Sequence, residues 1–274
     1  MTESAYVAVA QVPAVLGDVA HNLAAMGGWM KQATEKGAKL LVFPECYLSG
    51  YMFESRDDAY ASAIEQGGLE LEQVRLLCAE HSLEVVVGFL ERVGPKLYNV
   101  AAVIGPNGVT GIHRKRHLPF LGADRFVDEP EGIDVSVFDT AVGKVGVAIC
   151  YEIRFPEISR TLALAGADFI ALPTNWPVQS VLLADYFTRV RAAENFVFFL
   201  VANRADSEGD ADFLGKSQII DPLGNVIVNA GTDDGILVAA ADVDRARNKT
   251  IAFKAGEFEL SPWKDRRPAT YRLD

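Results

Sequence analysis

The sequence predicts an α/β fold in which two β-sheets pack face to face and helices cover their outer surfaces. Helical and strand patterns alternate along the chain, and two predicted strands, 39–43 and 168–172, are continuously apolar after their first residue and need cover on both faces. Residues 37–45 and 166–174 also echo each other, since both read Gly-Ala, then an apolar run, then Pro and a polar residue. We therefore expect two similar halves, each with a sheet and its own outer helices.

The first half begins with a strand–helix–strand unit. Residues 6–11 are rich in β-forming residues, Asp18 can cap a helix that runs to residue 36, and a buried strand follows at 39–43. Pro44 stops this strand and leaves Glu45 just beyond its carboxyl end. The next segments predict a helix and then a β-meander, at 69–81 and at 84–92, 97–104 and 109–113.

The second half starts with an apolar strand at 144–149 that ends at Cys150, after which Pro156 opens a helix. The remaining pattern predicts strands at 168–172 and 196–202, a helix over 180–195, and two strands flanking a turn at 221–225. The segment 256–274 is polar and aromatic, so we expect an irregular tail, which is a candidate for the subunit interface. No linker-like change in composition divides residues 1–274, and we expect a single domain.

Composition and charge argue against several classes of function. The chain is 50% hydrophobic and 23% charged, as ordinary globular proteins are, and no run of about 18 apolar residues predicts a membrane span. Its net charge of -11 repels nucleic acid and anionic membranes, and only the run 113–117 offers a basic patch. Three irregularly spaced cysteines and an N-terminus without a signal-peptide pattern predict a cytoplasmic protein without disulfides or a zinc site.

Cys150 is a candidate nucleophile because it lies where a strand ends and a helix begins. At such a point the helix amides and dipole lower the pKa of a thiol and can donate hydrogen bonds to an oxyanion. The alternative is a buried cysteine that serves as a small hydrophobic residue, which is the better interpretation of Cys78 on its helix.

Glu45 and Lys115 are candidates to assist such a thiol. Glu45 follows a buried strand at the edge where α/β folds gather their sites, although a solvated loop glutamate is the alternative. In an extended chain His113, Lys115 and His117 share one face, and the two arginines between them lie on the other. The lysine can then point inward as an oxyanion clamp, whereas a solvated charge run is the alternative.

Three segments, LLVFPE, HRKRHLP and VAICYEIRFPE, resemble in order and separation the signature segments of the nitrilase (carbon–nitrogen hydrolase) superfamily. The segments VAVAQ, PTNWP, RAAEN and DRRPATY extend the resemblance over nearly the whole chain. It implies a four-layer α-β-β-α sandwich of two mixed sheets with pseudo-two-fold internal symmetry, assembled as a homodimer or a higher homo-oligomer. It also implies a triad of Glu45, Lys115 and Cys150 that needs no metal or organic cofactor.

The mechanism that this resemblance implies passes through a thioester. Glu45 takes the thiol proton, Cys150 attacks the amide carbon, and Lys115 with the backbone N–H of Tyr151 holds the oxyanion. Many members carry a second glutamate several residues after the lysine, where this chain has Asp124, with Glu129 as a weaker candidate. Aspartate is shorter by one methylene, so Asp124 either orients Lys115 or water through a shifted loop or has no role.

A small aliphatic carboxamide is the expected substrate. Relatives that cleave N-carbamoyl amino acids often carry two adjacent arginines after the cysteine, whereas this chain has Ile153 and a single arginine. The run Cys-Tyr-Glu at 150–152 resembles amidase-like branches rather than the Cys-Trp-Glu of nitrilases. N-carbamoyl amino acids and nitriles stay as alternative substrates. Tyr51, Asn175 and Trp176 are candidates to line the acyl pocket, although Trp176 could equally be a core residue.

Two alternatives concern the class of protein. A papain-like enzyme would use Cys150 with His113 or His117 as its base, although the flanking residues do not match that family's signature. A catalytically idle binding scaffold is the second alternative, but a scaffold has no use for an inward lysine and glutamate around a thiol. The sequence thus favours a hydrolase in which Glu45, Lys115 and Cys150 lie together.

Overall fold

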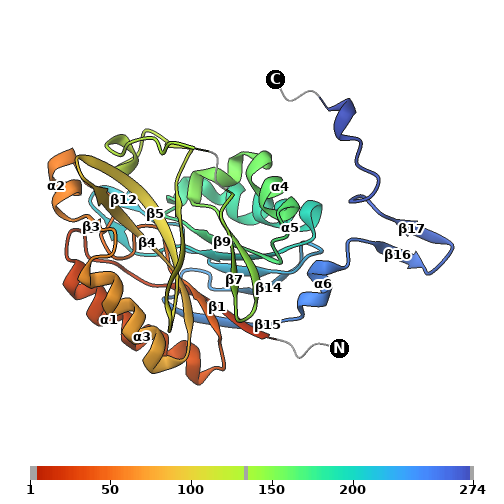
Figure 1. Ribbon diagram of the computed structural model, residues 1–274, viewed down its shortest axis with the longest axis horizontal. Coiled ribbons are helices and arrows are strands. Elements are labelled where there is room, and N and C mark those ends of the chain that lie inside the picture. The colour runs from red at the N-terminus through yellow and green to blue at the C-terminus, as the bar shows by residue number, and fades with distance from the viewer. Residues whose placement is uncertain (1–4, 133–134, 272–274) are drawn as a thin grey trace.

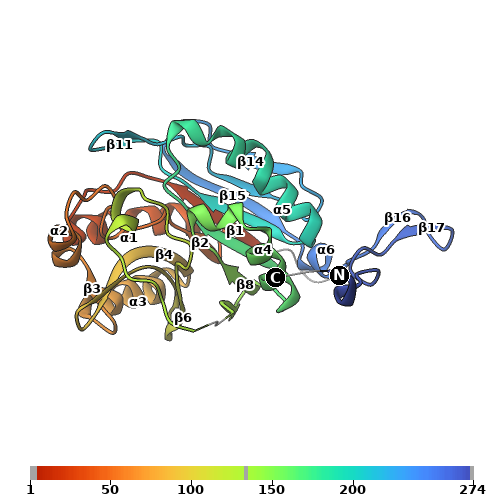
Figure 2. The ribbon, with the colours of Figure 1, turned by 90° about the horizontal axis from the view of Figure 1, so that it is seen from above.

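The computed structural model describes residues 5–132 and 135–271. Two mixed β-sheets lie at its centre, with helices on both outer sides (Figure 1). On one side lie α1 (Val19–Glu35) and α3 (Leu69–His81), and on the other lie α4 (Pro156–Leu164) and α5 (Thr188–Asn195). Figure 2 shows the same layers from above. The predicted four-layer α-β-β-α sandwich of two mixed sheets is confirmed.

The first sheet comes from the N-terminal half and one late strand. Its strands in spatial order are β15 (Gly235–Ala241), β1 (Ala5–Gln11), β2 (Leu40–Val42), β4 (Glu84–Val93), β5 (Lys96–Gly105) and β6 (Gly108–Arg114). A short strand outside this order, β3 (Ile64–Glu65), pairs with β4. Strands β1, β2 and β4 run parallel, whereas β15, β5 and β6 are antiparallel to their neighbours. Strand β15 was not predicted from the sequence.

The second sheet repeats this arrangement. Its strands in spatial order are β7 (Val137–Thr140), β8 (Gly143–Val147), β9 (Phe169–Pro173), β10 (Phe198–Ala202), β13 (Gln218–Ile220) and β14 (Val226–Asn229). Here β8, β9 and β10 are parallel, with one antiparallel strand on one side and two on the other. The echoing segments form β2 and β9, the middle parallel strand of each sheet. The internal two-fold relation thus extends from the sequence to the strand order.

Apolar side chains join the layers. Val42 of β2 and Val147 of β8 belong to one buried cluster, which also takes in Leu162 of α4 and Ala192 of α5. A second cluster joins the outer face of the first sheet to α1 through side chains such as Met30. Because burial of one such large apolar side chain contributes about 1.5–3 kcal/mol, this core fixes the strand ends at which the polar site lies.

The helices follow most of the predicted signals. Asp18 caps α1 by accepting a hydrogen bond from the backbone N–H of His21 at 2.9 Å, and Pro156 is the first residue of α4. The helix expected over 180–195 contains a π-helical turn, Leu183–Phe187, ahead of α5. The short helices α2 (Arg56–Ala61) and α6 (Val243–Arg247) were not predicted, because so few residues show no helical period. No helix in the described part of the chain has the length and apolar character needed to span a bilayer.

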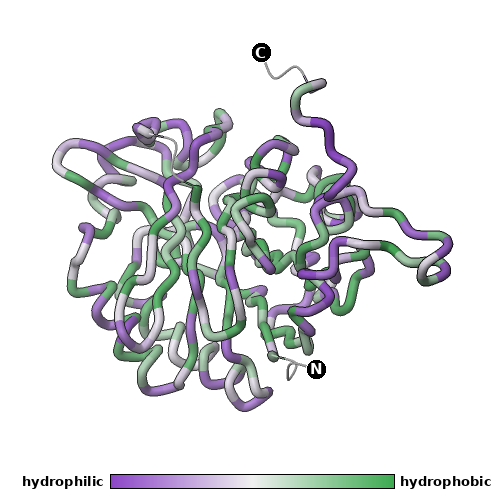
Figure 3. The backbone as a smooth tube through the Cα atoms, turned by 45° about the vertical axis from the view of Figure 1, so that its right-hand side comes forward, coloured by the Kyte–Doolittle hydropathy of each residue, from purple (hydrophilic) through white to green (hydrophobic). Residues whose placement is uncertain are grey.

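The C-terminal segment differs from the prediction. Gly256 lies in the turn between β16 (Ile251–Lys254) and β17 (Phe258–Leu260), where an irregular tail was expected, and a short 3-10 helix follows at Pro268–Thr270. Apolar residues at alternate positions of both strands favour this hairpin in spite of the polar composition around them. The hairpin projects from the sheets and carries exposed hydrophobic segments (Figures 1 and 3).

Candidate active site

Glu45, Lys115 and Cys150 come from three separate segments and meet beyond the carboxyl ends of strands. Glu45 follows β2 and Lys115 follows β6 in the first sheet, while Cys150 follows β8 in the second. Their exposed fractions are 1%, 1% and 6%, respectively. The structure therefore gathers the three candidate residues in a buried position between the sheets.

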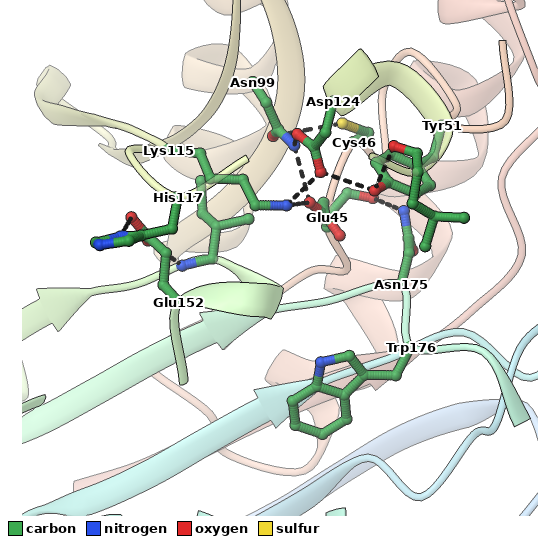
Figure 4. Close-up of polar contacts among 12 residues, drawn as sticks. Glu45, Cys46, Tyr51, Asn99, Lys115, His117, Asp124, Glu152, Asn175 and Trp176 are labelled. Atoms are coloured by element: carbon green, nitrogen blue, oxygen red, sulfur yellow. Dashed lines mark hydrogen bonds and ion pairs between the residues drawn. The ribbon is translucent and has the colours of Figure 1, made fainter. Parts of the chain in front are cut away.

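The Lys115 ammonium lies between two carboxylates (Figure 4). Its Nζ is 2.6 Å from Glu45 Oε1 and 2.5 Å from Asp124 Oδ2. The Asn99 amide donates to the same two groups, to Glu45 Oε1 at 2.8 Å and to Asp124 Oδ1 at 2.9 Å. Burial alone would lower the pKa of Lys115, but Asp124 and Glu45 raise it well above its ordinary value, so the amine stays charged.

Asp124 is the second carboxylate in contact with Lys115. It lies on a 3-10 turn, Gly122–Arg125, and the Tyr51 hydroxyl donates to its Oδ2 at 2.7 Å. The turn brings the aspartate close enough to offset the missing methylene. Glu129, the weaker candidate, is exposed and so lies outside the buried cluster. The described residues contain no group of three acidic, histidine or cysteine side chains that could hold a metal ion.

Cys150 differs from the expectation in its acidity. Burial raises the pKa of its thiol to about 12, and Glu45 adds to this, while Lys115, the Thr174 hydroxyl and the Asn175 N–H act in the opposite direction. The expected lowering of the thiol pKa by a helix is not found, because Cys150 begins only a five-residue 3-10 helix, Cys150–Arg154, ahead of α4. The side chain is therefore a thiol at neutral pH, and its activation requires a base.

Glu45 approaches the sheet closely because of Gly88 on β4. A Cβ atom at Gly88 would lie 2.5 Å from the backbone nitrogen of Cys46 and 2.7 Å from the carbonyl oxygen of Pro44. A larger residue would therefore push the Glu45 segment away from the sheet. Burial raises the pKa of Glu45, while Lys115 opposes this shift. A glutamate with a raised pKa is better matched to accepting a thiol proton than an ordinary glutamate.

The candidate pocket residues are buried beside this cluster. Asn175 Nδ2 donates to the Glu45 carbonyl at 2.8 Å, which fixes the side chain and leaves its Oδ1 without a partner among the described residues. Trp176 is buried, and its indole nitrogen likewise has no partner in the described structure. In Figure 4 this nitrogen lies on the ring edge that faces Glu45. Tyr51 is also buried, and its hydroxyl supports Asp124.

Three residues of the site were not identified from the sequence. Thr174 faces the thiol, and the echo had already aligned it with Glu45, which is the signal that could have identified it. Asn99 lies within β5 and carries no local signal. Glu208 belongs to a small hairpin of β11 (Ser207–Glu208) and β12 (Ala211–Asp212), and its carboxylate accepts from the Tyr51 N–H at 2.8 Å.

The two histidines do not fit the papain-like alternative. His113 uses both ring nitrogens, at 2.8 Å from Ser136 Oγ and 2.7 Å from Glu152 Oε2. His117 stacks on Phe155 with ring centroids 3.9 Å apart. Neither ring is therefore held as a base against Cys150.

Residues 6–250 match the protein family described as carbon-nitrogen hydrolase. The chain belongs to this family. It is an enzyme that hydrolyses carbon–nitrogen bonds other than peptide bonds.

This carbon–nitrogen hydrolase resembles curated proteins over most of its length. It is 38% identical to a nitrilase of Pyrococcus abyssi over 228 residues, which are 81% of this chain and 84% of the relative. It is 32% identical to an omega-amidase of Bos taurus over 238 residues, which are 82% of this chain and 84% of the relative.

Solved structures share the fold of this carbon–nitrogen hydrolase. A member of the nitrilase superfamily from Saccharomyces cerevisiae matches with a TM-score of 0.80 at 25% identity, over 94% of this chain and 98% of that one. An amidase from Nesterenkonia sp. matches with a TM-score of 0.78 at 23% identity, over 90% of this chain and 94% of that one. These structures share the fold, and the match to the carbon-nitrogen hydrolase family confirms the predicted assignment to the nitrilase superfamily.

Proposed function

We propose that this enzyme is an amidase that hydrolyses a small carboxamide to a carboxylic acid and ammonia through a thioester on Cys150. One observation carries the proposal: a buried ammonium lies 2.6 Å from the Glu45 carboxylate, and both charges act on the Cys150 thiol. Such a cluster provides a base, an oxyanion partner and a nucleophile in one place. Its near-complete burial favours substrates that are slim at the reacting end.

The proposed reaction has two halves. Glu45 accepts the thiol proton as the Cys150 sulfur bonds to the amide carbon, and Lys115 and the N–H of Tyr151 hold the oxyanion. The Tyr151 N–H suits this role because amides in the first turn of a helix have no acceptor within it. Collapse of the tetrahedral species breaks the C–N bond, and ammonia leaves with the proton that Glu45 returns. Water then attacks the thioester, Glu45 takes its proton, and the thiol and the acid are released.

Unpartnered acceptors favour an amide over a nitrile. Glu45 Oε2 and Asn175 Oδ1 are buried and lack hydrogen-bond partners among the described residues. A primary carboxamide brings two N–H donors that can pair with such acceptors, whereas a nitrile brings none. We propose that Asn175 contacts the reacting amide and that Trp176 and Tyr51 line the acyl pocket.

Similarity to an omega-amidase and to an amidase supports this choice, while similarity to a nitrilase supports the alternative that the same cluster hydrolyses nitriles. For N-carbamoyl amino acids, Ile153 is buried and offers no cation to a substrate carboxylate. In a catalytically idle binding scaffold, the buried side chains of Glu45, Lys115 and Cys150 would have no function, although burying ionisable groups costs free energy. The small aliphatic amide is therefore the substrate class that we propose.

Ammonia release from matched substrates tests the proposal. We expect kcat/KM for butyramide to exceed that for butyronitrile, which has the same carbon skeleton, by about 10²-fold or more, because the nitrile leaves buried acceptors unpaired. N-carbamoyl-β-alanine should be hydrolysed more slowly than the amide. A preference for the nitrile would support the nitrilase alternative, and no ammonia from any member of a broad panel would contradict the amidase.

Asp124→Asn should lower kcat by about 10- to 100-fold with little change in KM, because the Lys115 ammonium loses a charged partner that holds it in place. Steady-state kinetics on the preferred amide measure the effect. Asp128→Asn is the matched control, since Asp128 follows on the same loop but pairs with Arg56 at 2.8 Å, away from the cluster. An unchanged kcat in Asp124→Asn would show that Asp124 has no role in the reaction.

We also propose a homodimer that forms through α5 and the π-helical turn before it. Leu182, Tyr186 and Val190 are exposed at helical spacing, while Leu183 is buried, so this segment presents an apolar stripe outward.

Free, buried cysteines fit the reducing environment of the cytoplasm, which we propose as the location. The shared core of the two sheets supports residues 1–274 as one hydrolase domain.

A further inference from the structure

One buried carboxylate, that of Glu152, joins the segment of Lys115 to the segment of Cys150. Its Oε1 accepts a hydrogen bond from the backbone N–H of Arg116 at 2.9 Å. Its Oε2 accepts from the backbone N–H of Ile149 at 2.8 Å. Arg116 directly follows Lys115, and Ile149 directly precedes Cys150. A single side chain thus holds the backbone next to both candidate catalytic groups (Figure 4 shows Glu152 beside the Lys115 segment).

The Glu152 carboxylate is itself held in place. Glu152 is 0% exposed, and Nε2 of His113, which is 4% exposed, lies 2.7 Å from its Oε2. The other ring nitrogen of His113 is 2.8 Å from Ser136 Oγ. Burial alone would raise the pKa of Glu152, but His113, His117 and the Arg116 N–H lower it well below its ordinary value. The side chain is therefore ionised, and both of its oxygens act as acceptors.

This link matters because Lys115 and Cys150 belong to different sheets. The Lys115 N–H donates to the Asn99 carbonyl of β5 at 2.8 Å, which anchors the lysine to the first sheet. The Ala148 N–H donates to the Ala171 carbonyl of β9 at 3.1 Å, which anchors the cysteine segment to the second sheet. The apolar core holds the two sheets together, but apolar contacts are not directional and do not orient individual polar groups. Hydrogen bonds to a common carboxylate restrain both segments directionally.

The backbone conformation of Cys150 also depends on support from neighbouring contacts. Its φ of 49° lies in the left-handed region, which is unfavourable for residues other than glycine. Such a conformation persists only where neighbouring contacts enforce it. The Ile149 N–H bond to Glu152 lies one residue before the strained position, and the Glu152 N–H bonds back to the Ile149 carbonyl at 3.0 Å.

We propose that Glu152, held by His113, is a positioning residue that fixes the Lys115 ammonium relative to the Cys150 thiol across the two sheets. This inference rests on the proposed amidase function of Lys115 and Cys150. Glu152 touches neither the substrate nor the reacting atoms in this account. It acts by keeping the oxyanion partner and the nucleophile at a fixed separation.

Glu152→Gln tests this role. Glutamine has one oxygen and one NH2 group, so either the Arg116 N–H or the Ile149 N–H must face a donor and lose its acceptor. We expect kcat to fall by about 10²-fold, as a misplacement of about 1 Å produces, with little change in KM. Steady-state kinetics and thermal unfolding are measured on the same preparations.

Glu91→Gln is the matched control. Glu91 is also a fully buried glutamate, and it pairs at 2.7 Å with Arg114, which directly precedes Lys115. Among the described residues it has no hydrogen bond to the Cys150 segment. Both variants remove one buried carboxylate beside β6. We expect Glu91→Gln to keep the wild-type kcat even if its melting temperature falls. Equal losses of kcat in the two variants would overturn the positioning role.

A double-mutant comparison tests whether Glu152 acts through Lys115. The background is Lys115→Ala with Asp124→Asn, which removes one positive and one negative charge together and so keeps the net charge of the cluster. Residual turnover of an activated aryl ester is measured with and without Glu152→Gln. We expect no further loss in this background, because residues that act as a unit are not additive. A full additional 10²-fold loss would contradict the proposal.

His113 provides an independent test if Glu152→Gln fails to fold. Glutamine at position 113 can still donate an N–H toward Glu152, whereas leucine cannot. We expect His113→Leu to lower kcat and His113→Gln to restore most of it. Wild-type kcat in a folded His113→Leu would overturn the inference. If Cys150→Ala and Lys115→Ala both kept full activity, the proposed function itself would fail, which is a different outcome.

Discussion

Glu45→Gln is expected to reduce kcat/KM by about 10³-fold while the protein stays folded. Glutamine keeps the shape of the side chain but cannot accept the Cys150 proton, and a positioned general base contributes about 10²–10⁴-fold. The fold should tolerate the change, because Lys115 then faces Asp124 alone and the buried charges balance as one positive and one negative. Ammonia release and thermal unfolding measure the two effects.

The matched comparison for Glu45→Gln is Glu91→Gln, which also neutralises a buried glutamate of the first sheet but leaves the cluster intact. The Glu91 variant should keep the wild-type rate. If Glu45→Gln retained more than about a tenth of the wild-type rate, general-base catalysis by Glu45 would be wrong.

Cys150→Ala is expected to abolish turnover, with a loss of at least about 10⁴-fold, because removal of a nucleophile eliminates the covalent route. Cys150→Ser should be similarly inactive, since a hydroxyl gives up its proton less readily than a thiol. Rates of ammonia release on the preferred amide check both variants.

The other two cysteines serve as controls for Cys150. Cys78 lies on α3, and Cys78→Ala should keep the wild-type rate even if it lowers stability. Cys46 lies beside Glu45, and burial raises the pKa of its thiol well above the ordinary value. Activity that survives Cys150→Ala but disappears in Cys46→Ala would assign the nucleophile to Cys46 instead.

Much of the fold could be predicted because it depends on local patterns. The continuous apolar runs that became β2 and β9 required cover on both faces, and the echo between them marked the equivalent central strands of two sheets. Polar residues just after such strands, such as Glu45 and Cys150, were therefore expected at the carboxyl ends of strands, where α/β folds gather their sites. Alternation of side chains along residues 113–117 also predicted that Lys115 points inward, and Lys115 is buried in the structure.

Other features depend on contacts between distant segments, which no local pattern reveals. Asn99 and Glu152 became visible only when the structure brought their side chains to Glu45 and to the Arg116 backbone. The pKa of the Cys150 thiol is raised, although the sequence predicted that it is lowered. Burial outweighs the effect of the five-residue 3-10 helix that begins at Cys150. The C-terminal hairpin was missed because its two strands are short and polar residues surround them.

Intact-mass spectrometry during turnover tests the central claim most directly. Samples of the enzyme with its preferred amide are quenched in acid, weighed and digested to locate any adduct. We predict a mass increase equal to the acyl group of the substrate, located on Cys150 and removed by hydroxylamine, as expected of a thioester. Ammonia release without an adduct on Cys150, or with the adduct on Cys46, would contradict it.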